Sequence, residues 1–396
     1  MDASTEASAE GEGMMDEAAM ASAPQPMYDM LRDSSPVFRS DFGVVLSRYE
    51  DVQYALRRWE LFSSKGVVEI GNVRPLIPLG VDPPDHVKYR RLLDPLFAPR
   101  QVARLEGDVR LLVNELIDDF IADGEVEFNR AFAIPLPCTV FLRLLGLPLE
   151  DLDVFLEFKD NIIRPGGADA DDTQRILKET GQRIYAYFEQ VIDARAAEPQ
   201  DDLISRFLEA EIDGVRLSRE DILDICYLFL LAGLDTVTAS LGCAVAYLAQ
   251  HPDHRDALVR DPSLVSGAIE ELLRWETPVP GVPRVLTQDV EIAGEMLKAG
   301  ESVTCLLGSA NIDGAEFAGP SDVDFAREPN RHLAFGGGVH RCLGSHLARL
   351  EMQVALNELH RRIPDYAIKP GEEPKFGAGI RTVEYLPLVF TPAPGA

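Results

Sequence analysis

A run of 26 residues, Ile225 to Gln250, constrains the fold most, because it contains a single charged residue, Asp235. As an α-helix this run would be roughly 39 Å long, enough to cross either a membrane or the core of a large protein. An aspartate at mid-span costs about 2.5 to 3.5 kcal/mol in a membrane, which disfavours the membrane interpretation. We therefore expect a long central helix, from Asp224 to His251, buried inside a soluble protein.

The flanks of the run carry boundary signals of an ordinary soluble helix. Ser218 can cap the first turn, acidic residues follow it there, and Pro252 comes directly after the predicted end. Gly233 fits a local distortion near the middle. A buried carboxylate has to be hydrogen-bonded or solvated, so we expect a gap filled with water or a ligand beside Asp235.

The rest of the chain has mostly helical periodicity. Amphipathic patterns predict helices at residues 50–58, 85–97, 103–122, 134–145, 173–196, 202–210, 263–275 and 344–362. Alternating segments predict short strands near residues 37–46, 284–292, 302–307 and 384–390. No flexible linker divides these elements after residue 26. We expect a mainly α fold with small β-sheets (α+β) in a single domain at residues 27–396.

Composition excludes several classes of protein. The net charge of −28 leaves no chain-wide footprint for nucleic acid or anionic membranes. Residues 1–26 contain six acids and neither Lys nor Arg, which predicts a disordered acidic tail rather than a targeting signal and favours a cytoplasmic location. The odd, scattered cysteines fit a reducing compartment, and four of them are expected to be buried apolar residues: Cys138, Cys226, Cys243 and Cys305.

The fifth cysteine lies in a distinctive loop, FGGGVHRCLG at residues 335–344. Phe335, Gly338, His340, Cys342 and Gly344 form the pattern F-x-x-G-x-H-x-C-x-G just before a predicted helix. The glycines allow the backbone to approach a flat ligand closely, and the helix N-terminus is expected to favour the Cys342 thiolate. Such a thiolate is suited to ligating haem iron.

A zinc site is the alternative interpretation of this loop. It would use the side chains of His340, Cys342 and His346. Gaps of one and three residues across a helix start do not readily converge on a tetrahedron, so zinc is disfavoured.

Three motifs together resemble the cytochrome P450 family. They are the cysteine loop, AGLDT at residues 232–236, and EELLR around Glu271 and Arg274, in the order and spacing of that family. The similarity extends through residues 82–100 and 331–351 and is typical of a soluble bacterial member. It implies a P450-like fold with a long central helix that binds haem b through an axial Cys342 thiolate.

The resemblance also implies roles for other residues around the haem. His86, Arg90, Arg284 and His340 would bind its two propionates, and Phe335, Gly338 and Gly344 would shape the loop beneath it. A buried structural ion-pair network would consist of Glu271, Arg274 and Arg327. The expected substrate pocket consists of Ile70, Leu76, Ile77, Ala232, Val279, Val282 and Ile380, and Arg74 offers a partner for a substrate carboxylate. One departure from the family pattern, residues 311–314, is expected to affect only a surface turn.

The adjacent Asp235 and Thr236 are the predicted catalytic residues. Reductive activation of O₂ requires protons, and a hydroxyl beside a carboxylate can hold and relay water. We therefore predict a haem-thiolate monooxygenase that hydroxylates or epoxidises a hydrophobic small molecule of the terpenoid, steroid, fatty acid or macrolide class. Two alternatives stay open: a non-catalytic haem-thiolate ligand-binding or sensor protein, which would not need this pair, and a P450-type isomerase or dehydratase.

Electrons are expected from a separate protein, because the sequence shows no P-loop, dinucleotide fingerprint or ferredoxin-like cysteine cluster. We expect a monomer served by an acidic ferredoxin, or a similar redox protein, with an NAD(P)H-dependent reductase. The predicted docking residues are Lys88, Arg90, Arg91, Arg100, Arg104 and Arg341.

Overall fold

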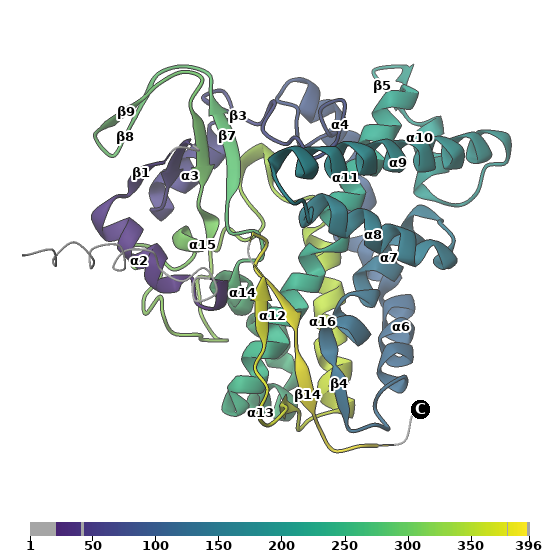
Figure 1. The fold of residues 1–396 in the computed structure, drawn as a ribbon, viewed down its shortest axis with the longest axis vertical. Helices are drawn as coiled ribbons and strands as arrows, with labels where there is room; N and C mark the ends of the chain where they lie inside the picture. The colour runs from purple at the N-terminus through teal and green to yellow at the C-terminus, as the bar shows by residue number, and fades with distance from the viewer. Residues whose placement is uncertain (1–20, 41–42, 378, 394–396) are drawn as a thin grey trace, which may run out of the picture.

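The computed structural model describes residues 21–40, 43–377 and 379–393. Helices make up the larger part of the molecule, and a five-stranded sheet lies to one side of them with α2 and α3 (Figure 1). This mainly α architecture with small sheets confirms the expected fold class.

The central helix is divided into two parts that meet at Asp235. The first, α11, spans Arg219–Leu234, and the second, α12, spans Thr236–Gln250. Ser218 caps α11 as expected, in a capping box with Asp221. The helix is long and apolar enough to cross a membrane, but 78% of its most apolar window is buried inside the protein. It is therefore a core helix.

Most of the predicted helices are present, with ends that shift by a few residues. They are α3 (Tyr49–Arg57), α4 (Asp85–Leu93), α6 (Glu106–Asp118), α7 (Pro135–Leu145), α9 (Ala170–Ala197), α10 (Leu203–Glu209), α14 (Val265–Glu276) and α16 (Ser345–Arg362). The helix expected at 103–122 is shorter, because it starts as a 3₁₀ turn and ends at Asp118.

Several helices were not predicted from the sequence. They are α2 (Gln25–Ser34), α5 (Pro99–Val102), α8 (Leu152–Ile163), α13 (Pro252–Arg260) and α15 (Leu307–Ala310). Each is at most 12 residues long. Tertiary packing, rather than local periodicity, decides whether such short helices form.

The largest sheet joins strands from distant parts of the chain, in the order β1-β2-β10-β7-β3. Its strands are Val37–Ser40, Gly43–Leu46, Ser302–Cys305, Val282–Leu286 and Phe62–Ser63, respectively. β10 pairs parallel with β2 and antiparallel with β7. The strand expected at 284–292 is therefore two strands, β7 and β8, with a turn between them.

The other sheets are small. β11 (Ala367–Ile368), β14 (Pro387–Val389) and β4 (Glu125–Glu127) form one of them. Three hairpins pair β12 (Lys375–Gly377) with β13 (Thr382–Tyr385), β5 (Glu211–Ile212) with β6 (Val215–Arg216), and β8 (Val290–Ile292) with β9 (Glu295–Leu297).

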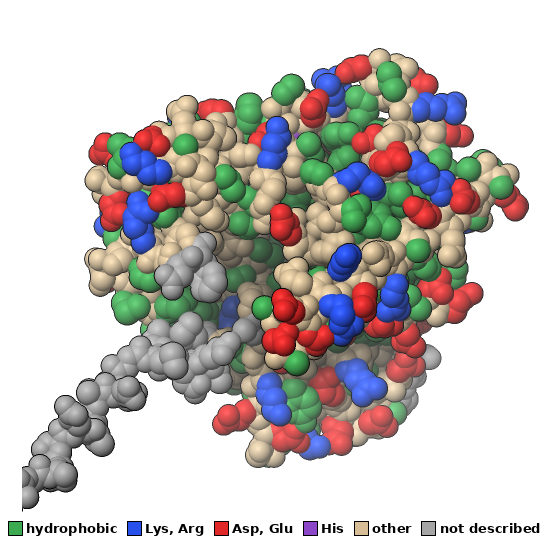
Figure 2. Space-filling model, turned by 45° about the horizontal axis from the view of Figure 1, so that its top comes forward, with side chains coloured by type: hydrophobic (Ala, Val, Ile, Leu, Met, Phe, Trp, Pro, Cys, Tyr) green, Lys and Arg blue, Asp and Glu red, His purple; other side chains and the backbone are tan. Residues whose placement is uncertain are grey.

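The surface carries both signs of charge. On the face shown in Figure 2, Lys and Arg alternate with Asp and Glu over the described part of the chain. No large area of one sign is visible on that face.

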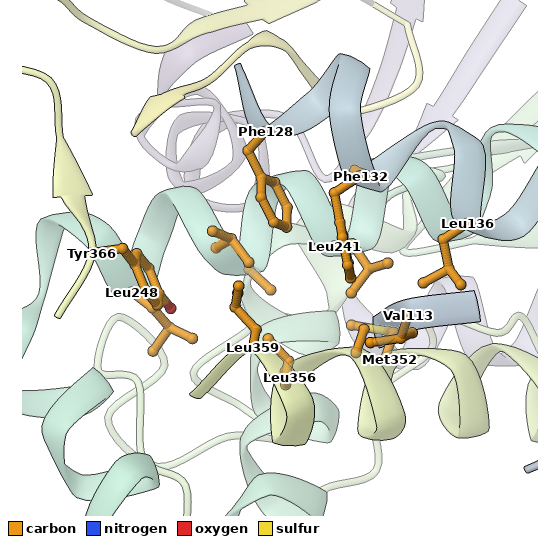
Figure 3. Packing of buried hydrophobic residues seen from close by; sticks show 14 of the residues in the cluster. Val113, Phe128, Phe132, Leu136, Leu241, Leu248, Met352, Leu356, Leu359 and Tyr366 are labelled. Carbon is orange, nitrogen blue, oxygen red and sulfur yellow. The ribbon is translucent and has the colours of Figure 1, made fainter. Parts of the chain in front are cut away.

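The main hydrophobic core holds α12 against α16. Leu241 and Leu248 of α12 pack with Met352, Leu356 and Leu359 of α16, under the aromatic rings of Phe128 and Phe132 (Figure 3). Both helices run in the same direction through this core, so their N-termini lie at the same end. Thr236 begins α12 and the cysteine loop precedes α16, so packing brings these two motifs toward one region.

The last residues of the predicted tail belong to the folded domain. Residues 1–20 of the predicted tail lie outside the described residues. Ala21 and Ser22, in contrast, accept hydrogen bonds from Arg381, and α2 already begins at Gln25. The boundary expected after residue 26 was therefore wrong for residues 21–26.

Candidate active site

The cysteine loop has a well-defined backbone. The Cys342 N–H donates to the Phe335 carbonyl at 2.8 Å, which closes the loop. Gly338 has φ +63°, and a Cβ there would lie 2.1 Å from the Leu56 carbonyl oxygen of α3, so only glycine fits. Arg90 of α4 donates to the Arg341 carbonyl at 2.7 Å. Two neighbouring helices therefore fix the loop.

Cys342 is the accessible cysteine among the five of this chain, and the other four are buried as expected. The surrounding protein nevertheless desolvates its sulfur and raises the thiol pKa, while the Gly344 N–H and the cations of Arg90 and Arg341 act in the opposite direction. The N–H of Gly344 at the helix N-terminus thus favours the thiolate as expected, but desolvation is the larger effect. A bound metal cation would stabilise the thiolate here.

A buried cluster of basic side chains lies next to this loop. The rings of His86 on α4 and His340 have centroids 4.3 Å apart, and Arg284 of β7 is also buried. Both ring nitrogens of His86 and Nε2 of His340 have no hydrogen-bond partner. Arg284 forms no ion pair with any carboxylate in the described chain. Burial and the neighbouring positive charges lower the pKa of His86 to about 4 and that of His340 to about 3.

Unpaired buried donors of this kind fit a ligand that carries two carboxylates. Buried polar groups are nearly always hydrogen-bonded, so these orphaned atoms call for an anionic partner. The nearest carboxylate, Asp82, is 3.9 Å from His340 Nε2 and already accepts from Ser63 and the Ser64 N–H. The residues therefore match the propionates of a haem. For the zinc alternative, no group of three or more His, Cys, Asp or Glu side chains is arranged for a metal among the described residues.

Asp235 is satisfied by two cations rather than by a water-filled gap. Its carboxylate accepts from Arg164 Nη2 at 2.9 Å and lies 3.3 Å from Lys159 Nζ, and the residue is 1% exposed. Both partners belong to α8 or its C-cap. The expected gap does not adjoin the Asp235 carboxylate itself, because α8, a helix that was not predicted, supplies cations that enclose it.

Thr236 lies at the start of α12, directly after Asp235. Its hydroxyl donates to the Ala232 carbonyl at 2.9 Å. Ala232 itself is exposed in the middle of an otherwise buried helix, so this turn borders accessible space. A buried, ion-paired carboxylate therefore stands next to a hydroxyl at the edge of an accessible region.

Glu271 is the centre of a buried network that satisfies both of its carboxylate oxygens. Its carboxylate accepts from Arg274 at 2.8 and 2.9 Å, from Arg327 at 3.0 and 3.1 Å, and from Asn330 at 3.1 Å. These contacts lower the Glu271 pKa against the effect of desolvation. Arg274 also donates to the carbonyls of Asn311 and two residues of the loop before the cysteine motif.

Comparison with known proteins identifies the family. The family model for cytochrome P450 matches residues 152–363. A steroid C26-monooxygenase of Mycobacterium tuberculosis is 37% identical over 378 residues, covering 93% of this chain and 94% of the relative. The chain belongs to the cytochrome P450 family.

Further relatives agree with this assignment. A methyl-branched lipid omega-hydroxylase of Mycobacterium bovis is 35% identical over 363 residues, which are 87% of this chain and 83% of that protein. A P450 of Bacillus megaterium, solved in complex with testosterone, superposes with a TM-score of 0.89 at 28% identity, covering 94% of this chain and 99% of the other. The protein is a P450 monooxygenase that uses haem with a cysteine thiolate ligand, a redox partner and a hydrophobic substrate, and its relatives fit a soluble protein.

A second carboxylate of the EELLR motif has a role that the sequence did not suggest. Glu270 accepts from Arg349 of α16 at 2.6 and 2.7 Å and lies 3.0 Å from His332 Nε2. These partners hold the Glu270 pKa at about 2, against the opposing effect of burial. The Arg349 guanidinium lies over the Phe335 ring, 4.3 Å from its centroid. In this P450, the pair thus connects α14 to the start of the cysteine loop.

The predicted pocket residues differ in how deeply they are buried. Ala232 is exposed, and Ile70, Val279, Val282 and Ile380 are half-buried. Leu76 and Ile77 are buried in the hydrophobic cluster around α7, α9 and α11. Leu76 and Ile77 are therefore core residues in this structure.

Two further expectations about polar residues were wrong. Arg74 is held by the carboxylate of Asp224 at 2.8 and 3.1 Å, which leaves it committed to this buried partner rather than to a substrate. Asn311 is fully buried, and its side chain links the Leu333 N–H to the Thr277 hydroxyl. The unusual sequence at 311–314 therefore forms an internal junction rather than a surface turn.

Glu351 of α16 is a buried acid outside these networks. It is 3% exposed, its Oε2 has no hydrogen-bond partner, and burial raises its pKa to about 8. Between an ordinary value of about 4.3 and about 8, the folded protein binds a proton that the unfolded chain lacks. The free energy of unfolding therefore falls as the pH rises through this window.

We expect Glu351→Gln to stabilise the P450 increasingly with pH. Between pH 5 and 7.5 the gain over the parent should grow by about 3 kcal/mol, at about 1.4 kcal/mol per pH unit. Denaturant unfolding at several pH values measures this. Glu358→Gln, on the same helix, is the control: arginine partners lower the Glu358 pKa, so that substitution should destabilise the protein above about pH 4.3. A pH-independent effect of Glu351→Gln would contradict the argument.

Proposed function

We propose that Cys342 supplies the axial thiolate of haem b and that His86, Arg90, Arg284 and His340 hold its propionates. The observation that carries this proposal is the set of unpaired buried donors beside the accessible cysteine. Phe335, Gly338 and Gly344 would shape the loop that presents Cys342 to the haem. When bound, the haem iron binds and activates O₂. Arg90 also donates to Asp94 and to the Arg341 carbonyl, so it also fixes the loop.

We propose that Asp235 and Thr236 deliver protons to this site. The two cations on Asp235 hold its carboxylate in a fixed orientation, and Thr236 presents its hydroxyl beside the accessible turn at Ala232. A positioned hydroxyl can hold one water molecule for proton transfer while the apolar helix excludes bulk water.

Thr236→Ala tests the second half of this relay. We expect the variant to bind haem normally and to consume NAD(P)H, but to release hydrogen peroxide instead of forming product. Thr236→Ser is the control and should retain most of the coupling. The ratio of product formed to NAD(P)H consumed measures the effect. An unchanged ratio in Thr236→Ala would remove Thr236 from the mechanism.

We propose that the substrate is a hydrophobic lipid, with a steroid as the first candidate. The half-buried pocket residues are apolar. Steroid and lipid hydroxylases among the relatives, and the neighbouring structure with testosterone, support this choice. A further neighbour is a mutant of P450 EryK in complex with erythromycin B, which keeps the macrolide class open.

Isotope labelling separates this function from its alternatives. The purified protein is supplied with testosterone or hexadec-9Z-enoic acid, a ferredoxin, a reductase, NADPH and ¹⁸O₂. A monooxygenase incorporates one labelled oxygen atom into the product. A sensor would bind the compound without product, and an isomerase or dehydratase would form a product without the label.

We propose an acidic ferredoxin as the electron donor, docking beside the cysteine loop. Arg91, Arg100, Arg104 and Arg341 are exposed and form no ion pair in the described chain. Lys88, in contrast, is paired with Asp85. Unpaired arginines around the loop suit an acidic partner.

Charge reversal at Arg104 and Arg341 tests this surface. The Arg104→Glu/Arg341→Glu variant should be reduced at least about tenfold more slowly by an acidic ferredoxin at low salt, and less so at high salt. Arg39→Glu/Lys298→Glu changes the net charge equally, at exposed sites on β1 and beside the β8–β9 hairpin, and is the control. Equal reduction rates in both variants would argue against docking here.

We also propose that residues 27–396, together with the preceding residues of α2, form one monomeric, cytoplasmic monooxygenase domain. The central helix is packed inside this domain, which supports the cytoplasmic assignment.

A further inference from the structure

A buried arginine connects the N-terminal segment to the predicted pocket. Arg381 is 7% exposed, and its Nε donates to Glu276 at the end of α14 at 2.5 Å. Its two terminal nitrogens donate to the carbonyls of Ala21 and Ser22, the latter at 3.1 Å. One guanidinium therefore joins the last residue of α14 to a segment some 360 positions away in the chain.

The backbone of the same residue connects two of the predicted pocket segments. Arg381 directly follows Ile380, and its N–H donates to the Pro278 carbonyl at 2.8 Å. Pro278 precedes Val279 in the segment that leads into β7. The positions of Val279 and Ile380 are therefore coupled through a hydrogen bond made by Arg381.

The N-terminal segment also contacts α15, which makes a second hydrogen bond to the segment that leads into β7. The Gly308 N–H of α15 donates to the Pro280 carbonyl at 3.0 Å. Tyr28 of α2 packs directly on Gly308, where a Cβ would lie 2.9 Å from the tyrosine ring. Arg32 of α2 donates to the Ser309 carbonyl at 2.7 Å and to its hydroxyl at 2.9 Å. Figure 1 shows α2 close to α15.

We infer that residues 21–34, here called the N-terminal strap, position the pocket segments 278–282 and 379–382 through Arg381 and Gly308. The inference rests on the proposed function, because that assigns these segments to the substrate pocket. Arg381 is a positioning residue in this account. Without the strap, two buried guanidinium donors would lose their acceptors, and such losses are costly. The strap therefore contributes to substrate specificity without touching the substrate.

Two truncations test the strap. Deletion of residues 2–23 removes both carbonyl acceptors, since Met1 then precedes Pro24 directly, and it leaves the Arg381–Glu276 ion pair intact. Deletion of residues 2–18 retains the acceptors and is the control. Hydrogen exchange of the purified proteins should be faster in peptides covering 276–284 and 379–386 after the longer deletion only. Equal exchange in these peptides after both deletions would overturn the inference.

Azole binding gives a second readout that does not require the natural substrate. Imidazole ligates the iron alone, whereas clotrimazole also fills space above it. We expect the longer deletion to weaken clotrimazole binding relative to imidazole binding by about fivefold, which corresponds to about 1 kcal/mol. The shorter deletion should leave the ratio of the two dissociation constants unchanged. An unchanged ratio after the longer deletion would contradict a role in pocket shape.

A side-chain variant covers the case in which the longer deletion fails to fold. Tyr28→Ala removes the ring that packs on Gly308, and Tyr28→Phe retains it. Only Tyr28→Ala should increase exchange in residues 276–284, and equal exchange in both variants would count against the strap. If the parent protein itself lacks a thiolate-haem spectrum, the proposed function fails, while the exchange experiments still report on the strap.

Discussion

Glu271→Ala is expected to yield apoprotein or aggregate instead of a haem-loaded P450. The substitution removes the carboxylate that pairs with both Arg274 and Arg327, which are 0% and 9% exposed at their side chains. Leaving a buried charge unpaired costs about 3 to 5 kcal/mol. The whole free energy of unfolding of a domain is about 5 to 15 kcal/mol, so this loss is severe.

The haem-to-protein absorbance ratio and the thermal midpoint of the purified protein measure this effect. Glu60→Ala is the control, because Glu60 forms an exposed ion pair with Arg58 and should change neither quantity appreciably. A folded, haem-replete Glu271→Ala variant with a normal midpoint would refute the structural role assigned to the network.

Asp235→Asn should lower the rate of product formation by about 100-fold while the haem spectrum stays unchanged. The amide cannot relay protons, and general acid–base groups contribute about 10² to 10⁴ to rates. Lys159 retains Asp160 as a partner at 2.8 Å, so the fold should tolerate the change. The rate with saturating substrate and reduced ferredoxin measures the effect, and the solvent deuterium isotope effect should increase.

Asp160→Asn provides a matched control for this experiment. It makes the same chemical change on the other partner of Lys159, at a side chain that is 61% exposed. This variant should retain turnover within about twofold of the parent. Equal rates in Asp235→Asn and the parent would show that Asp235 has no part in proton delivery.

Local sequence patterns predicted those parts of the structure that depend on neighbouring residues. The central helix, its cap at Ser218 and the break near Gly233 follow from apolar periodicity and capping chemistry. The cysteine loop was predicted from its motif, with glycines expected to approach a flat ligand, whereas in the structure Gly338 is required by the close approach of the Leu56 carbonyl. The Glu271 network was inferred from the family pattern, and its contacts are present.

The features that the sequence did not predict depend on contacts between residues far apart in the chain. Lys159 and Arg164 reach Asp235 across more than 70 positions from α8, a helix that was not predicted from the sequence. Asn311 resembles a turn residue in sequence, yet a three-dimensional junction makes it a buried bridge. The contact of Arg381 with Ala21 is of the same kind. No local pattern distinguishes such buried polar residues from exposed ones.

The reduced carbon monoxide spectrum tests the central claim that Cys342 ligates the haem iron. The reduced parent protein should show the red-shifted Soret band that characterises thiolate-ligated haem, and Cys342→Ser should lose it. Cys305→Ser, at a buried cysteine outside the loop, should keep the band. A parent protein without this band, or a Cys342→Ser variant that retains it, would contradict the account.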